Sequence, residues 1–221
     1  MTRHMDREIS KLKRKILALS AVVEGSVQRA VQALATRDDK LANEVIERDV
    51  EIDQAEVDVE EECLKSLALY QPVAIDLRFV IAILKINNDL ERIGDEAVNI
   101  AERALFLSRQ ERISMPFDFA LMSEKTQAML RKSLDSLVNL DAGLAHAVGR
   151  DDDEVDDLNR QAYLRIQQAI RRDPEKVEAL VHLLSISRHM ERIADYATNI
   201  AEEVVYMIEG EIIRHKAEAF Q

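Results

Sequence analysis

Glycine and proline are scarce in this chain of 221 residues, which contains 5 glycines, 3 prolines and no tryptophan. Average usage would give these two residue types about 12% of the chain together. Folds made of many strands need many tight turns, and turns use glycine and proline because these residues supply special backbone angles. The scarcity excludes a β-sandwich or β-barrel and disfavours a glycine-rich nucleotide loop. It predicts an all-α protein with a few long helices.

Other deficits narrow the range of functions. The single cysteine, Cys63, has no partner for an internal disulfide, which is typical of a reducing cytoplasm. No apolar run approaches the roughly 18 residues of a membrane span, and the first residues lack the apolar region of a signal peptide. A net charge of −12 repels a phosphate backbone. We therefore expect a cytoplasmic protein that neither binds nucleic acid nor spans a membrane.

Prolines and capping residues mark the expected helix boundaries. Pro72, Pro116 and Pro174 each precede a long periodic run, and proline is favoured in the first turn of a helix. Thr36-Arg-Asp-Asp and Gly149-Arg-Asp-Asp-Asp offer N-capping side chains, and the glycine would end the preceding helix. These breaks predict helices near residues 5–35, 38–69, 73–110, 117–148, 151–171 and 175–213.

The chain contains an internal repeat. Residues 91–102 read ERIGDEAVNIAE and residues 191–202 read ERIADYATNIAE, which are identical at nine of twelve positions. The order of breaks also repeats, with a short acidic break followed by a proline break. We therefore expect two three-helix bundles, residues 1–114 and 115–221, packed side by side or end to end.

The repeated segment places acidic and amide side chains on one helical face, because positions i, i+4, i+8 and i+11 lie together. An apolar stripe runs roughly opposite, so we expect this polar face to point outward. Its members are Glu91, Asp95, Asn99 and Glu102 in the first copy and Glu191, Asp195, Asn199 and Glu202 in the second.

The preceding helix of each copy carries a matching acid pair. Asp49 and Asp53 have this spacing in the first copy, and Asp152 and Asp156 have it in the second. A short turn at proline would make the two acid-bearing helices of each copy antiparallel neighbours. Each copy would then bring two acid pairs together.

Paired carboxylates of this kind indicate a cation site. Like charges at i and i+4 destabilise a helix, and a bound cation converts their repulsion into coordination. Carboxylate oxygens suit magnesium, manganese, calcium or iron better than copper. The asparagines and the glutamates at the ends of the repeated segments would support the ligands. The competing interpretation is a solvated acidic face, which is common in a chain with 42 acids.

Known catalytic motifs are missing. Ferritin-like di-iron proteins use Glu-x-x-His, and none of the five histidines has a glutamate three residues before it. No nucleophile elbow, Walker motif or zinc spacing occurs. Two alternatives stay open beside a metal-binding regulator: a helical carboxylate–metal enzyme, and a metal-free adaptor whose acidic faces bind basic partner surfaces.

These residues resemble a known family. Glu91-Arg-Ile-Gly-Asp and Glu191-Arg-Ile-Ala-Asp in tandem, with Tyr70-Gln-Pro-Val-Ala-Ile-Asp-Leu-Arg before the first, resemble the signature of the PhoU family of phosphate-uptake regulators. The resemblance covers nearly the whole chain. It departs at Ala194, which replaces Gly94, and after Pro174, where no Asp-Leu-Arg follows. The two copies therefore need not be equivalent.

The resemblance implies a non-enzymatic cytoplasmic regulator, recruited to the inner face of the membrane through its partners. Those partners would be the phosphate ABC transporter and a phosphate-sensing histidine kinase, and the regulator would keep the phosphate-starvation response off when phosphate is plentiful. It also implies multinuclear metal clusters of iron or zinc, while carboxylate chemistry also admits manganese or magnesium. We further expect a homo-oligomer, most simply a dimer. The implied metal ligands are Asp49, Asp53, Glu91, Asp95, Asp152, Asp156, Glu191 and Asp195.

Overall fold

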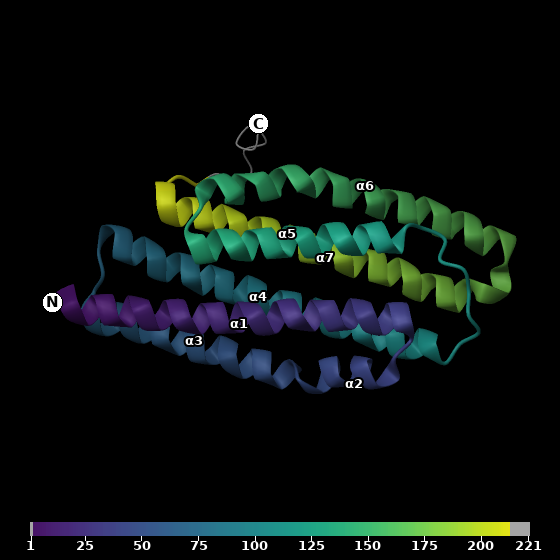
Figure 1. Ribbon diagram of the computed structural model, residues 1–221, viewed down its shortest axis with the longest axis horizontal. Coiled ribbons are helices and arrows are strands. Elements are labelled where there is room, and N and C mark those ends of the chain that lie inside the picture. Colours follow the sequence, from purple (N-terminus) through teal and green to yellow (C-terminus); the bar gives the residue numbers. More distant parts are fainter. Residues whose placement is uncertain (1, 213–221) are drawn as a thin grey trace.

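The computed structural model describes residues 2–212, and these residues form helices without any strand. The all-α prediction is therefore confirmed. The helices run along the long axis of an elongated molecule, and the two halves of the chain lie side by side rather than end to end (Figure 1). The elements are α1 (Thr2–Thr36), α2 (Asp39–Glu47), α3 (Asp49–Tyr70), α4 (Ala74–Ser108), α5 (Phe119–Asn139), α6 (Ala142–Arg172), the 3-10 turn η1 (Pro174–Lys176) and α7 (Val177–Glu209).

The predicted break at Gly149 is wrong. Helix α6 runs through Gly149 without interruption, and the chain turns instead around Leu140, which adopts a left-handed backbone with φ of 51°. Asp141 caps α6, because its carboxylate accepts a hydrogen bond of 2.9 Å from the backbone N–H of Leu144. A capping aspartate therefore sets the boundary, and no backbone group at Gly149 requires a glycine there. The expected helices 117–148 and 151–171 become 119–139 and 142–172.

The remaining boundaries lie close to the predictions. Asp38 caps α2, since its carboxylate accepts from the backbone N–H of Leu41 at 3.1 Å. The single helix expected over 38–69 is interrupted at Arg48, which separates α2 from α3. Helix α7 ends at Glu209 and Gly210 caps it with φ of 78°, whereas its predicted end at 213 lies outside the described residues.

Helices α4 and α7 are the central pair of the molecule. They pack against each other, and each also contacts helices of its own repeat: α1, α2 and α3 around α4, and α5 and α6 around α7. The predicted apolar stripes are fully buried, at Leu90, Ile93, Ala97 and Ile100 in α4 and at the matching positions of α7. Burial of these stripes orients the opposite, acidic faces outward, as the sequence predicted. No helix within residues 2–212 combines the length and apolar character needed to cross a bilayer.

The small residue in each repeated segment sets how closely the acid-bearing helices approach. A Cβ added at Gly94 would lie 3.0 Å from Ile52 Cδ1 and 3.2 Å from Ile52 Cγ2. The equivalent of Ile52 in the second repeat is Val155, and the equivalent of Gly94 is Ala194, all of them buried. The two side chains of each pair therefore contain the same total number of carbon atoms. The pair is glycine with isoleucine in the first repeat and alanine with valine in the second.

This exchange predicts energetic coupling between positions 52 and 94. Gly94→Ala should destabilise the protein by about 1 kcal/mol, because overpacking outweighs the gain in helix propensity. Ile52→Val should cost about 1 kcal/mol as a buried deletion. The double variant should be more stable than the sum of these losses by about 1 kcal/mol, since it recreates the pair of the second repeat. Denaturant unfolding measures all three free energies.

A matched control is Ile83→Val, which removes the same methyl group from a buried site elsewhere in α4. Combined with Gly94→Ala, its cost should simply add. Additive costs for Ile52→Val and Gly94→Ala as well would contradict the proposed packing exchange.

Candidate metal centres

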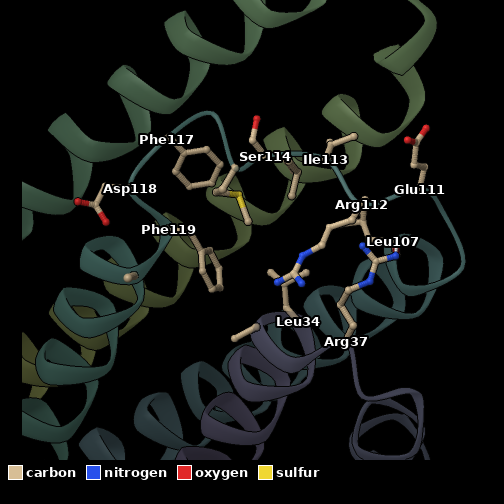
Figure 2. A pocket seen from close by; sticks show the side chains of 14 residues that line it. Leu34, Arg37, Leu107, Glu111, Arg112, Ile113, Ser114, Phe117, Asp118 and Phe119 are labelled. Carbon is tan, nitrogen blue, oxygen red and sulfur yellow. Dashed lines mark hydrogen bonds between the residues drawn. The ribbon is translucent and has the colours of Figure 1, made fainter.

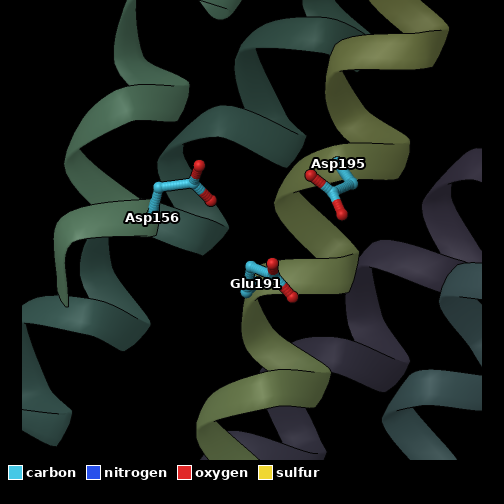
Figure 3. A group of neighbouring side chains, drawn as sticks. All are labelled: Asp156, Glu191 and Asp195. Atoms are coloured by element: carbon cyan, nitrogen blue, oxygen red, sulfur yellow. The ribbon is translucent and has the colours of Figure 1, made fainter. Parts of the chain in front are cut away.

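The second repeat brings three predicted carboxylates together. Asp156 from α6 and Glu191 and Asp195 from α7 each offer one oxygen, and these oxygens lie within 4.8 Å of one another (Figure 3). Asp156 and Glu191 are half-buried, and Asp195 is exposed as a whole residue although its carboxylate is partly shielded from solvent. None of the three forms an ion pair with lysine or arginine among the described residues. Their negative charge is therefore not neutralised by direct protein contact.

Asp152, the fourth predicted ligand of this repeat, lies near the trio but outside it. The Thr198 hydroxyl on α7 donates a hydrogen bond of 3.4 Å to Asp152 Oδ1. Burial raises the pKa of Asp152 to about 6, helped by the charges of Asp195 and Asp156. The hydrogen bond from Thr198 places Asp152 on the α7 side of α6, where its charge interacts with those of Asp195 and Asp156.

Partial burial and repulsion from neighbouring acids also raise the pKa values of two members of the trio, Glu191 and Asp195. Burial raises the pKa of Asp195 to about 6, with added repulsion from Glu191 and Asp156. The pKa of Glu191 is raised mainly by burial and then by Asp156, although Arg188 opposes the shift. The folded chain therefore disfavours the charged form of these carboxylates, and either a proton or a cation would relieve the cost.

The first repeat forms a corresponding but looser cluster between α3 and α4. Burial raises the pKa of Asp49 to about 6, and Asp53 and Asp95 raise it further. Burial also raises the pKa of Asp95, with Asp53 as the next cause. The pKa of Glu91 shifts in the same direction. These four predicted ligands thus interact electrostatically, although their oxygens do not converge as closely as those of the trio.

Glu56 is a further member of the first cluster. Burial raises its pKa, with repulsion from Glu60 and Asp53 as further causes, and its charge in turn raises the pKa of Glu91. Asn87 on α4 orients it by donating to Glu56 Oε1 at 2.9 Å. The sequence signal for Glu56 is its position three residues after Asp53, on the same face of α3. The i, i+4 spacing that defines the predicted ligands does not include Glu56.

Two of the four residues expected to support the ligands, Asn99 and Glu102, both contact Arg103. Asn99 Oδ1 accepts a hydrogen bond of 3.3 Å from Arg103, and Glu102 pairs with the same guanidinium at 3.0 Å. Asn199 lines a groove on the α4 side of α7, beside Lys85. Glu202 is half-buried on α7. The structure does not bring Glu102 or Glu202 into the converging group.

A buried polar bridge connects the helices that carry the two clusters. Glu96, next to Asp95 on α4, is almost fully buried and accepts from Arg192 Nη1 at 2.8 Å. Its other oxygen lies 2.5 Å from His189 Nδ1 on α7. Because Arg192 follows Glu191 directly, this bridge holds the motif of one repeat against the motif of the other.

The donor set fits a hard cation. It consists of carboxylate oxygens on two neighbouring helices of each repeat, without the cysteine or histidine ligands that softer metals prefer. Uncompensated negative charge and raised pKa values mean that cation binding would relieve an existing cost. Of the two clusters, the trio needs the least movement to coordinate an ion.

Comparison with known proteins matches the chain to one family. The family model described as PhoU domain matches residues 16–104 and 119–204. The "Phosphate-specific transport system accessory protein PhoU homolog" of Aquifex aeolicus is 40% identical over 210 residues, covering 95% of each chain. The homologue of the same name in Pseudomonas aeruginosa is 35% identical over 216 residues, covering 97% of this chain and 89% of its own.

Solved structures agree with these matches. The crystal structure of PhoU from Pseudomonas aeruginosa superposes with a TM-score of 0.89 at 36% identity, over 93% of this chain and 99% of that one. The phosphate transport system regulatory protein PhoU from Streptococcus pneumoniae gives a TM-score of 0.83 at 30% identity, over 94% of this chain and 98% of that one.

The raised pKa values predict how pH affects the metal-free protein. The pKa values of Asp49, Asp152 and Asp195 are about 6 in the folded chain against 3.8 in the unfolded chain. The folded state therefore binds more protons between these values, so its free energy of unfolding should rise as pH falls from 7 to about 5. Denaturant titrations in chelator at several pH values measure this slope.

The matching variant is Asp49→Asn/Asp152→Asn/Asp195→Asn, which keeps side-chain size but removes the charges. It should be more stable than the parent at pH 7 and should show a flatter pH dependence. Equal slopes for the two proteins would show that these carboxylates do not carry the effect.

Proposed function

The chain belongs to the PhoU family, and we propose on that basis that it is a non-enzymatic accessory protein that regulates phosphate uptake. Support comes from the family match in both repeats and from relatives named as accessory proteins of the phosphate-specific transport system. The fold supports this function because its half-buried acidic clusters lie on an outward face, without the buried ligand set of a helical oxygen-activating enzyme.

We propose further that the acidic clusters bind metal ions. The convergence of Asp156, Glu191 and Asp195 carries this proposal, because these carboxylates meet without a lysine or arginine to pair with them. Iron, zinc, manganese or magnesium would supply the compensating charge, and the four acids of each repeat are enough to bridge more than one ion. The ligands of the second repeat hold α6 against α7, and those of the first hold α3 against α4.

The regulatory consequence is a braced docking surface. With the carboxylates neutralised, each acid-bearing helix pair presents a more rigid face to the phosphate ABC transporter and to a phosphate-sensing histidine kinase. The protein, acting as a homodimer on the cytoplasmic side of the membrane, would keep the starvation response off when phosphate is plentiful. The polar bridge at Glu96 holds the two faces in one orientation.

Removing the trio should remove metal. Asp156→Asn/Glu191→Gln/Asp195→Asn replaces each ligand with a neutral side chain of the same shape, so the metal content of the second repeat should be lost while the helical circular dichroism is retained. Elemental analysis of protein purified without chelator measures the content. A second variant, Asp49→Asn/Asp53→Asn/Glu91→Gln/Asp95→Asn, tests the first repeat.

The control is Asp153→Asn/Asp157→Asn/Glu178→Gln, which makes the same charge change at exposed acids outside the clusters. It should keep its full metal content. Unchanged metal in the trio variant, or equal loss in the control, would rule out this assignment. Absence of metal from the parent protein as well would favour the metal-free adaptor.

The regulatory role is tested in a strain that lacks this chain and any second copy. Alkaline phosphatase should become active in phosphate-rich medium, because repression would be lost. The parent gene and the control variant should restore repression, whereas the trio variant should restore it only in part. Normal repression in the deletion strain would contradict the regulatory role regardless of metal content.

A further inference from the structure

A cavity lies at the end of the molecule where the two repeats are joined. Its volume is about 530 Å³, and residues 111–115, 117 and 118 of the connecting segment 109–118 form one wall (Figure 2). The opposite wall comes from both repeats, with Leu34 on α1, Leu107 on α4 and Leu183 on α7. A molecule in this cavity would therefore touch both bundles and the segment that joins them.

One end of the cavity is apolar. Phe117 and Phe119 stand edge to face with ring centroids 6.5 Å apart, and Figure 2 shows both rings on the same side of the cavity. Met115 and Ile113 from the connecting segment line it as well. Apolar walls around a space of this size are typical of pockets that hold small organic ligands.

The other end carries two guanidinium groups. Arg37 donates to the carbonyl oxygens of Leu107 at 2.5 Å, Ser108 at 2.8 Å and Gln110 at 2.5 Å, so its position is fixed. Arg112 extends into the cavity beside Leu34 and Arg37, and it makes no hydrogen bond or ion pair within residues 2–212 (Figure 2). Two cationic groups thus face the same space, and only Arg37 has protein acceptors.

The acids near the cavity do not neutralise Arg112. The Glu111 carboxylate points away from the two guanidinium groups (Figure 2). Asp118 lies toward the phenylalanines, where its carboxylate caps α5 by accepting from the backbone N–H of Leu121 at 3.0 Å. The cavity is open to solvent and therefore combines apolar walls with, at one end, an exposed cation that has no acceptor among the described residues.

We propose that this cavity binds a small organic anion with an apolar body, such as a medium-chain or aromatic carboxylate. The anionic group pairs with Arg112, and the apolar body lies against Phe117, Phe119 and Leu34. Bound there, the ligand fixes the connecting segment against both repeats and so stabilises one relative placement of the two bundles. This site is separate from the acidic clusters and does not depend on their metal content.

Binding is tested on the full chain with decanoate, at concentrations below those at which decanoate aggregates, by calorimetry and by the shift in thermal unfolding temperature. Decanoate should bind and raise that temperature. Arg112→Gln should weaken binding by about tenfold, because a charge-assisted hydrogen bond is lost. Arg109→Gln is the matched control, since Arg109 is an exposed arginine of the same segment, as Arg112 is, but does not line the cavity.

Two related probes separate the contributions of charge and apolar body. Decan-1-ol should bind to the parent protein more weakly than decanoate does. The parent protein and Arg112→Gln should bind decan-1-ol equally well. Inorganic phosphate should not compete with decanoate. Equal binding of decanoate to the parent and Arg112→Gln proteins, or full competition by phosphate, would overturn the proposal.

A substitution that fills the cavity tests whether decanoate binds there. Ala35 lines the cavity at the end of α1, so Ala35→Phe should abolish decanoate binding, whereas Ala68→Phe, at an exposed alanine of α3, should not. Both changes are at exposed helix positions, and circular dichroism checks that the fold is kept. Decanoate binding that survives Ala35→Phe, or is lost equally in Ala68→Phe, would place the ligand elsewhere.

Discussion

The packing of α4 against α7 is the constraint on which the rest of the structure depends. Each helix buries one stripe of side chains against the other helix and its own bundle, and Ile93 and Ile193 are fully buried within these stripes. A carboxylate of the repeated segment therefore lies on the remaining face unless partners on the other helix pair with it. Burial of Glu96 between the two helices is tolerated because His189 and Arg192 pair with it, whereas its neighbour Asp95 has no ion pair among the described residues. The same packing thus produces a buried acid that is paired with basic side chains and, beside it, a cluster of acids that repel one another.

The sequence predicted the parts of this structure that depend on local patterns. The repeat, the apolar stripes and the acid pairs follow from spacing along a helix, so their placement could be derived before any coordinates. The turn at Leu140 could not, because Gly149 and Asp141 both offer local signals for a break, and only the structure shows that the chain uses the cap at Asp141. The contact between Gly94 and Ile52, the bridge at Glu96 and the cavity around Arg112 all join residues far apart in the chain. Such contacts leave no periodic signal in a single sequence.

The two repeats differ in the turn that connects their two acid-bearing helices. Between α3 and α4, Gln71 and Ala74 adopt left-handed backbones with φ of 46° and 49°, and Val73 is 74% exposed and Ile75 67% exposed. Between α6 and α7 the turn is the polar segment Pro174–Lys176, without a positive φ. The second repeat shows that this fold can make the turn without strain or exposed aliphatic side chains. The fold therefore does not require the strained apolar turn of the first repeat. The segment that resembles the family signature begins at that same turn.

In the proposed metal-binding role, protons and cations compete for the carboxylates of the acidic clusters. Burial is the largest cause of the raised pKa in Asp49, Asp152 and Asp195, and repulsion between neighbours is second. The cost of ionisation therefore arises chiefly from lost hydration, which a proton or a coordinated cation can offset. At pH 7 a carboxyl group with a pKa of about 6 is only about one-tenth protonated, so protons leave most of that cost in place. A bound cation, as proposed, would be the more effective compensation at neutral pH, and it would also hold together the two helices whose carboxylates it bound. In the first repeat, helix packing and the proposed ion binding would favour the same arrangement, because a Cβ at Gly94 would lie 3.0 Å from Ile52 Cδ1 and 3.5 Å from Asp49 Oδ1.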